Sequence, residues 1–86
     1  MPLFIIERNF AEQLELTDAT VLGVQVVNDD VGVRWIYSFL SADKKKTYCL
    51  YEAASPELIL EAARRANVPA DEVIEVSQFV PEALVR

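Results

Sequence analysis

The order of β-type and helical segments constrains this fold more than any other feature of the sequence. Four short runs are dense in β-branched and aromatic residues, a composition typical of strands. They cover residues 3–10, 31–40, 47–52 and 72–79. Helical segments follow the first run and the third. The resulting order, β-α-β-β-α-β, leaves few topologies open to so short a chain.

The second helical segment, residues 55–67, carries clear boundary signals. Ser55 suits the N-cap and Pro56 the first turn, where a missing N–H costs nothing. Asn67 suits a left-handed C-cap, and Glu61 can pair with Arg65 one turn later. A stripe of small apolar residues predicts a face that lies close to a sheet: Ile59, Ala62, Ala63 and Ala66.

The first helical segment, residues 16–30, is ambiguous. Thr17 or Asp18 could cap a helix. One helical stripe is apolar: Ala19, Leu22 and Val26, with Val27 beside it. Valine and glycine are weak helix formers, so a strand is the alternative. We expect a helix, because a strand here would leave five strands and one helix.

This order predicts one α+β domain over residues 1–86 of the ferredoxin-like class. That class has a four-stranded antiparallel sheet with two helices on one face. The other face is bare, yet 52% of the residues are hydrophobic, and a chain this short buries only about 60–65% of its surface. The first strand is apolar on both faces. We therefore expect a homodimer, with a second copy covering the open sheet face as in a dimeric α+β barrel.

The composition excludes several functional classes. The net charge is −6 and no basic stripe is present, so we expect no nucleic-acid partner. The run Lys44-Lys45-Lys46 is interpreted as a solvated hairpin turn. The absence of histidine removes Ser-His-Asp triads and His-based zinc motifs. Two glycines form no phosphate-binding loop, and one cysteine forms no disulfide or CxxC pair.

The sequence also predicts a cytoplasmic protein without a membrane partner. The N-terminal residues turn polar after four apolar positions and lack a charged leader, unlike a signal peptide. No apolar run approaches the roughly 20 residues needed to span a bilayer.

Carboxylates, aromatic rings and one thiol on the strands are the remaining candidates for chemistry. Alternation places Val33, Trp35, Tyr37 and Phe39 on one face of the second strand. The hairpin register is left open by the turn length. We predict a ligand-binding groove lined by six residues: Glu7, Trp35, Tyr37, Cys49, Tyr51 and Glu52. The alternative is that the carboxylates pair with Arg8 or Arg34, Cys49 is an inert core residue, and the rings pack in the core or at a dimer contact.

Several segments resemble the small-protein family catalogued as domain of unknown function 4242. They are MPLFIIER (1–8), GVRWIYSF (32–39), YCLYEA (48–53), ARRANVPAD (63–71) and Glu75-Val76. The resemblance spans nearly the whole chain. It implies a ferredoxin-like domain that dimerises through its sheets, and a member of that family is a nickel-binding protein. The family pattern often has histidine where this chain has Tyr37 and Ala62.

Imidazole is the ligand that favours nickel over harder ions, so a divalent metal here would depend on carboxylates such as Glu7 and Glu52. Our first hypothesis is a non-catalytic dimeric binding domain for a small molecule or metal ion. A small dimeric α+β-barrel enzyme using Glu or Tyr as acid-base group is the second. A structural or regulatory domain without a ligand is the third.

Overall fold

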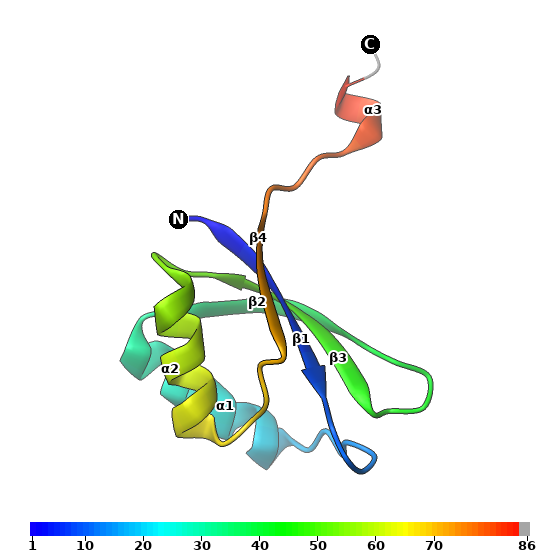
Figure 1. Ribbon diagram of the computed structural model, residues 1–86, viewed down its shortest axis with the longest axis vertical. Coiled ribbons are helices and arrows are strands. Elements are labelled where there is room, and N and C mark those ends of the chain that lie inside the picture. The colour runs from blue at the N-terminus through cyan, green and yellow to red at the C-terminus, as the bar shows by residue number, and fades with distance from the viewer. Residues whose placement is uncertain (85–86) are drawn as a thin grey trace.

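The expected β-α-β-β-α-β order is present in the computed structural model, which describes residues 1–84 (Figure 1). Val85 and Arg86, the end of the predicted 1–86 domain, lie outside the described residues. The elements are β1 (Leu3–Asn9), α1 (Asp18–Val31), β2 (Arg34–Leu40), β3 (Lys46–Glu52), α2 (Pro56–Ala66), β4 (Glu72–Val76) and a short α3 (Pro81–Leu84).

All strand pairs of the sheet are antiparallel, in the order β2-β3-β1-β4. This is the ferredoxin-like arrangement that the segment order predicted, with β1 and β3 in the centre. Both long helices lie on the same side of the sheet (Figure 1). The side that α1 and α2 cover is called the helix face below, and the opposite side the open face.

The hydrophobic core lies between the helix face and the two helices. Phe4 and Ile6 of β1 and Tyr51 of β3 are at most 2% exposed, and they pack in one cluster with Ile59 and Ala62 of α2. The small residues of α2 allow close approach to the sheet, so the stripe predicted for this helix is confirmed at Ile59, Ala62 and Ala63. Ser55 occupies the N-cap position without a side-chain hydrogen bond, and Asn67 ends the helix in the left-handed conformation (φ 58°).

The first helix is confirmed, but most of its apolar stripe does not face the core. Leu22 and Val26 are 57% and 67% exposed, whereas Val27 and Val31 pack against the core. Valines lie on both sides of α1, so apolar periodicity does not distinguish the two faces. A polar contact marks the inner side: Asn28 is 3% exposed, and its Nδ2 donates to the Tyr51 hydroxyl at 3.1 Å.

Both ends of α1 have local causes. Thr17 and Thr20 form a reciprocal capping box at the start. Gly32, at φ 89°, ends the helix with its N–H donating to the Asn28 carbonyl. Val31 is therefore helical, and β2 begins at Arg34, three residues later than predicted.

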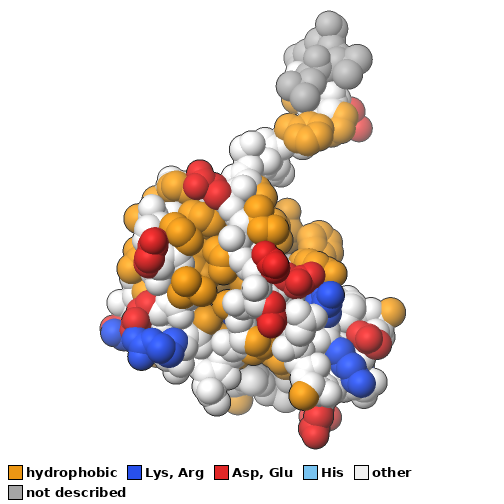
Figure 2. All heavy atoms as spheres, viewed as in Figure 1, with side chains coloured by type: hydrophobic (Ala, Val, Ile, Leu, Met, Phe, Trp, Pro, Cys, Tyr) orange, Lys and Arg blue, Asp and Glu red, His pale blue; other side chains and the backbone are white. Residues whose placement is uncertain are grey.

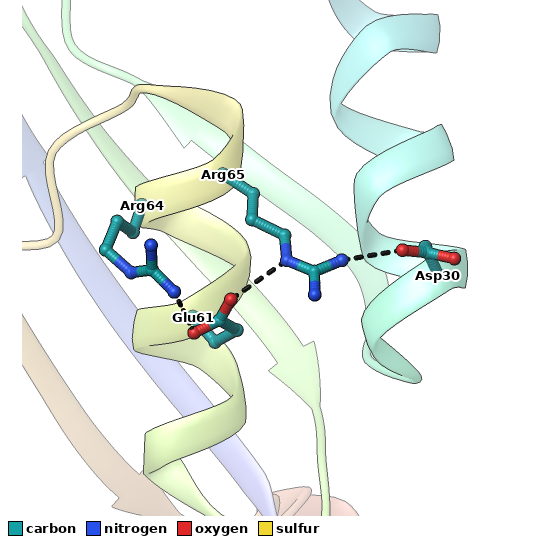
Figure 3. Close-up of polar contacts among 4 residues, drawn as sticks. All are labelled: Asp30, Glu61, Arg64 and Arg65. Carbon is teal, nitrogen blue, oxygen red and sulfur yellow. Dashed lines mark hydrogen bonds and ion pairs between the residues drawn. The ribbon is translucent and has the colours of Figure 1, made fainter.

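An ion pair joins α1 to α2, and it is continued by pairs within α2 (Figure 3). Nη1 of Arg65 lies 2.6 Å from Oδ2 of Asp30 at the end of α1, and its Nε lies 2.9 Å from Oε2 of Glu61. Arg64 pairs with the other oxygen of Glu61. Hydrogen bonds from Arg64, which has the larger effect, and from Arg65 hold the pKa of Glu61 below its usual value. The Glu61–Arg65 pairing predicted from the sequence is confirmed.

The second strand does not alternate as predicted, because it contains a bulge. Trp35 pairs with Tyr51 and Tyr37 with Leu50, so Ile36 is the extra residue. Trp35 thereby joins the helix face, whereas Tyr37 and Phe39 lie on the open face. The prediction that Trp35, Tyr37 and Phe39 share one face is wrong.

The C-terminal arm, residues 77–84, leaves the body after β4 and projects away from it (Figure 1). β4 ends at Val76 rather than at Phe79 as predicted, because nothing continues its pairing with β1. Phe79 is 70% exposed and Val80 47%. Figure 2 shows hydrophobic side chains on the arm well separated from the rest of the molecule.

Among the described helices, none has the length and apolar character needed to cross a membrane.

We expect Ile59→Ala to lower the free energy of unfolding by about 2–5 kcal/mol, because it opens a cavity at a fully enclosed position. Leu60→Ala is the matched control. Leu60 is the next residue on α2 and is 49% exposed, so its truncation should cost less than about 1 kcal/mol. Urea unfolding of both variants measures the difference. Equal losses would contradict the placement of α2.

Candidate functional site

The six residues predicted to line one groove lie on opposite faces of the sheet. Glu7, Tyr37 and Glu52 belong to the open face. Trp35, Cys49 and Tyr51 belong to the helix face, where Cys49 and Tyr51 are buried. The sheet separates the two sets, so they do not form a single groove within one chain. The bulge in β2 is the reason that Trp35 and Tyr37 lie on different faces.

The two open-face carboxylates are also apart from each other. Glu7 pairs across the strands with Tyr48, and Glu52 with Leu3. Leu3 and Glu7 are four residues apart on β1, which corresponds to about 13 Å. Each carboxylate has a basic partner instead: Glu7 lies 3.4 Å from Lys46 and Glu52 lies 3.6 Å from Arg34. The sequence alternative for Glu52, pairing with Arg34, is therefore confirmed.

A pocket of about 120 Å³ opens on the helix face. It lies between the sheet, the first half of α1 and the segment that connects β1 to α1. Its apolar lining includes Phe10, Leu14, Leu16, Val21, Val24 and Leu40. Trp35, Cys49 and Tyr51, three of the predicted site residues, also line it.

Two buried polar residues form part of the pocket floor. Arg8 of β1 and Thr47 of β3 are cross-strand partners on the helix face, 6% and 5% exposed. Nη1 of Arg8 donates to the carbonyl oxygen of Pro69, and the guanidinium carbon lies 5.7 Å from the centre of the Tyr51 ring. Within the described residues, no carboxylate lies within 4.0 Å of this guanidinium.

Sequence reasoning considered Arg8 only as a partner for a carboxylate and omitted Thr47. One signal could have found Arg8: it continues the alternation of Phe4 and Ile6, the inward-facing side of β1. An arginine on a buried stripe is rare unless it has a partner.

The remaining polar groups of the pocket are engaged. Trp35 Nε1 donates to Ser38 Oγ at 2.7 Å, and the Trp35 ring stacks on Tyr51 with centroids 6.3 Å apart. Cys49 Sγ lies 3.6 Å from Thr47 Oγ1. Burial raises the pKa of Tyr51, against the opposing effects of the Arg8 charge and the hydrogen bond from Asn28. Tyr51 therefore keeps its proton at neutral pH.

The family model for nickel-responsive proteins similar to SCO4226 matches residues 4–76. The chain belongs to this SCO4226-like family. A crystal structure of SCO4226 from Streptomyces coelicolor A3(2) is similar, with a TM-score of 0.75 and 22% identity over 91% of this chain and 99% of that chain. At this identity the likeness establishes the ferredoxin-like fold. No curated protein matches the chain.

The family match bears out the expected resemblance in a coarser form, as a small SCO4226-like domain, and it carries a different family name from the one expected. The family description mentions nickel, so the donor set of this chain was compared with what nickel requires. The chain has no histidine, and its described residues contain no group of three Asp, Glu or Cys side chains able to hold a metal. These donors do not fit a nickel site within one chain.

We expect the free energy of unfolding to fall as the pH rises above about 10, the usual tyrosine pKa. The folded state raises the pKa of Tyr51, so the unfolded chain releases this proton first and gains stability relative to the fold. The loss continues up to the raised pKa. Tyr51→Phe should flatten the pH dependence in urea unfolding between pH 9 and 11. Tyr37→Phe, which retains Tyr51, should keep it, and equal slopes in both variants would refute the assignment.

Proposed function

We propose that this protein is a homodimeric, non-catalytic binding domain that takes a small, largely apolar molecule into the pocket between α1 and the sheet. The observation that carries the proposal is the pocket itself. Its walls are mostly apolar, and they come from the sheet, from α1 and from the segments before α1 and after α2. Ligand sites in proteins usually combine an apolar lining with a few oriented polar groups.

The pocket's size limits the ligand. An engineered apolar cavity of about 150 Å³ binds benzene, and this pocket measures about 120 Å³. A single aromatic ring or a short branched chain fits that volume, whereas a nucleotide or a sugar chain does not.

The chemistry of the lining supports binding rather than catalysis. Its ionisable groups are Arg8, Cys49 and Tyr51. Arginine stays protonated and Tyr51 holds its proton more tightly than usual. The pocket lining includes no Asp or Glu among the described residues, so it offers no carboxylate acid-base pair. A metal ion is the less supported ligand, because the donor set described above does not suit it.

The homodimer is supported by the open face. Four large side chains there are well exposed in the single chain: Tyr37, Phe39, Tyr48 and Ile74, at 49%, 64%, 39% and 51%. Tyr37 and Phe39 contact edge to face, with ring centroids 5.6 Å apart. Lys46 and Glu7, which lie beside Tyr48 on this face, pair with each other, whereas Glu72 beside Ile74 has no ion pair among the described residues. A second copy offers the same apolar centre, which suits a two-fold contact.

Toluene is a suitable probe of the pocket, because it has the right size and no charge. We expect it to shift the NMR signals of Val21, Val24 and Val68, which line the pocket, and to raise the melting temperature. Leu14→Trp should block the pocket and abolish both effects. Leu22→Trp, on the outer side of α1, is the control and should leave them intact. Wild-type protein that shows no such shifts would contradict the proposal.

We expect Phe39→Lys to weaken the dimer at least tenfold, or by about 1.4 kcal/mol, because a charge would be buried at the centre of the contact. Leu60→Lys, at a similarly exposed site on α2, should leave the dimer unchanged. Sedimentation equilibrium measures both dissociation constants. A Phe39→Lys variant that dimerises as tightly as wild type would exclude the open face.

A further inference from the structure

The buried guanidinium of Arg8 has no charge partner among the described residues of its own chain. The three other arginines in the described part of the chain, Arg34, Arg64 and Arg65, each pair with a carboxylate at the surface. Arg8 is far more enclosed and meets a backbone carbonyl and the ring and hydroxyl group of Tyr51, none of which is an anion. Burial of a cation without an anion is unfavourable, so the site is electrostatically incomplete.

The free donors of Arg8 are not fully enclosed. A guanidinium carries five N–H donors, and Nη1 supplies the hydrogen bond to Pro69. In the described region no fully enclosed side-chain nitrogen lacks a partner. Donor nitrogens of Arg8 without a partner are therefore not sealed in the core, and Arg8 lines the pocket.

Thr47 places a second donor beside Arg8. The two residues are direct partners across β1 and β3, and both line the pocket. The Cys49 thiol lies 3.6 Å from Thr47 Oγ1 and can donate to it, which leaves the hydroxyl proton of Thr47 for another acceptor. A cation and a hydroxyl thus lie side by side, surrounded by apolar walls.

Resting on the pocket-binding function above, we propose that the ligand is a compact apolar monocarboxylate of about the size of benzoate. Its carboxylate binds the guanidinium of Arg8 and accepts from Thr47, and its hydrocarbon part lies against Val21, Val24 and Trp35. The planar guanidinium matches a carboxylate geometrically. One unpaired arginine neutralises one negative charge, so a phosphate dianion would leave excess charge in an apolar pocket of a chain whose net charge is −6.

The test is an NMR titration of the full chain with benzoate, its neutral analogue benzamide, and phenylphosphonate. We expect benzoate to bind with a dissociation constant on the order of 0.1–1 mM, given its few atoms. It should bind at least tenfold more tightly than benzamide, and more tightly than phenylphosphonate at pH 8. Equal binding of benzoate and benzamide, or tighter binding of the phosphonate, would overturn the inference without any variant.

Arg8→Met tests the residue. The ratio of benzamide to benzoate dissociation constants should fall to near one, while toluene still shifts the pocket signals and so reports an intact fold. Arg34→Met, which removes an exposed arginine of the open face, should retain the ratio. An unchanged ratio in Arg8→Met would refute the role of Arg8. Thr47→Val serves in its place if that variant does not fold. We expect Thr47→Val to bind benzoate at least threefold more weakly and benzamide with little change. Unchanged benzoate binding would count against the site.

The outcomes also separate this inference from the proposed function. If toluene and benzamide bind in the pocket without any preference for benzoate, the carboxylate inference fails and the binding function stands. If none of the probes shifts the pocket signals, the proposed function fails and the inference falls with it.

Discussion

The structure depends on a sheet whose central strands are apolar on both faces while helices cover only one. β1 carries Phe4 and Ile6 toward the helices and Leu3 and Ile5 toward the open face, the latter two only half-buried. β3 repeats the arrangement, with Tyr51 on the helix face and with Tyr48 and Leu50 on the open face, where Tyr48 is 39% exposed and Leu50 is buried. Since hydrophobic surface exposed over a whole sheet face is unfavourable in water, this two-sidedness links the fold to the proposed dimer.

The helix face contains buried polar residues as well as the apolar residues of the core. In the described part of the chain, three buried polar or charged residues lie on α1 or on the strands of the helix face: Arg8, Asn28 and Thr47. Asn28 has a structural role through its bond to Tyr51. Arg8 and Thr47 line the pocket, where Arg8 also bonds the Pro69 carbonyl and lies against the Tyr51 ring. The proposed binding role would give the buried cation of Arg8 the anion that the described residues do not supply, because a buried unpaired cation weakens a fold.

Much of this fold could be predicted from the sequence, since segment order and helix caps are local properties. Pro56 and Asn67 define α2 whatever surrounds it, and Gly32 could have been recognised as the C-cap of α1. Two features depend on the tertiary structure and escaped prediction. The inner side of α1 is set by Asn28 meeting Tyr51, which no periodicity in a valine-rich helix reveals. The bulge at Ile36 places Trp35 and Tyr37 on opposite faces of the sheet, which the alternating pattern of the sequence does not predict.

The candidate site shows the same limit. Of the six residues predicted to line one groove, Trp35, Cys49 and Tyr51 line the pocket. Glu7, Tyr37 and Glu52 are on the other side of the sheet, because strand alternation separates neighbours that are close in sequence. Arg8 was missed as a pocket residue because its charge favoured a surface interpretation, although its position on β1 placed it inward.

The tyrosines allow a direct test of whether a second copy covers the open face. Tyr37 and Tyr48 lie on that face, and Tyr51 is buried against the helices. In hydroxyl-radical footprinting across a dilution series, we expect labelling of Tyr37 and Tyr48 to fall as the protein concentration rises through the dimer's dissociation constant, with Tyr51 protected throughout. Labelling of Tyr37 and Tyr48 that stays high at every concentration would show that no second copy covers the sheet.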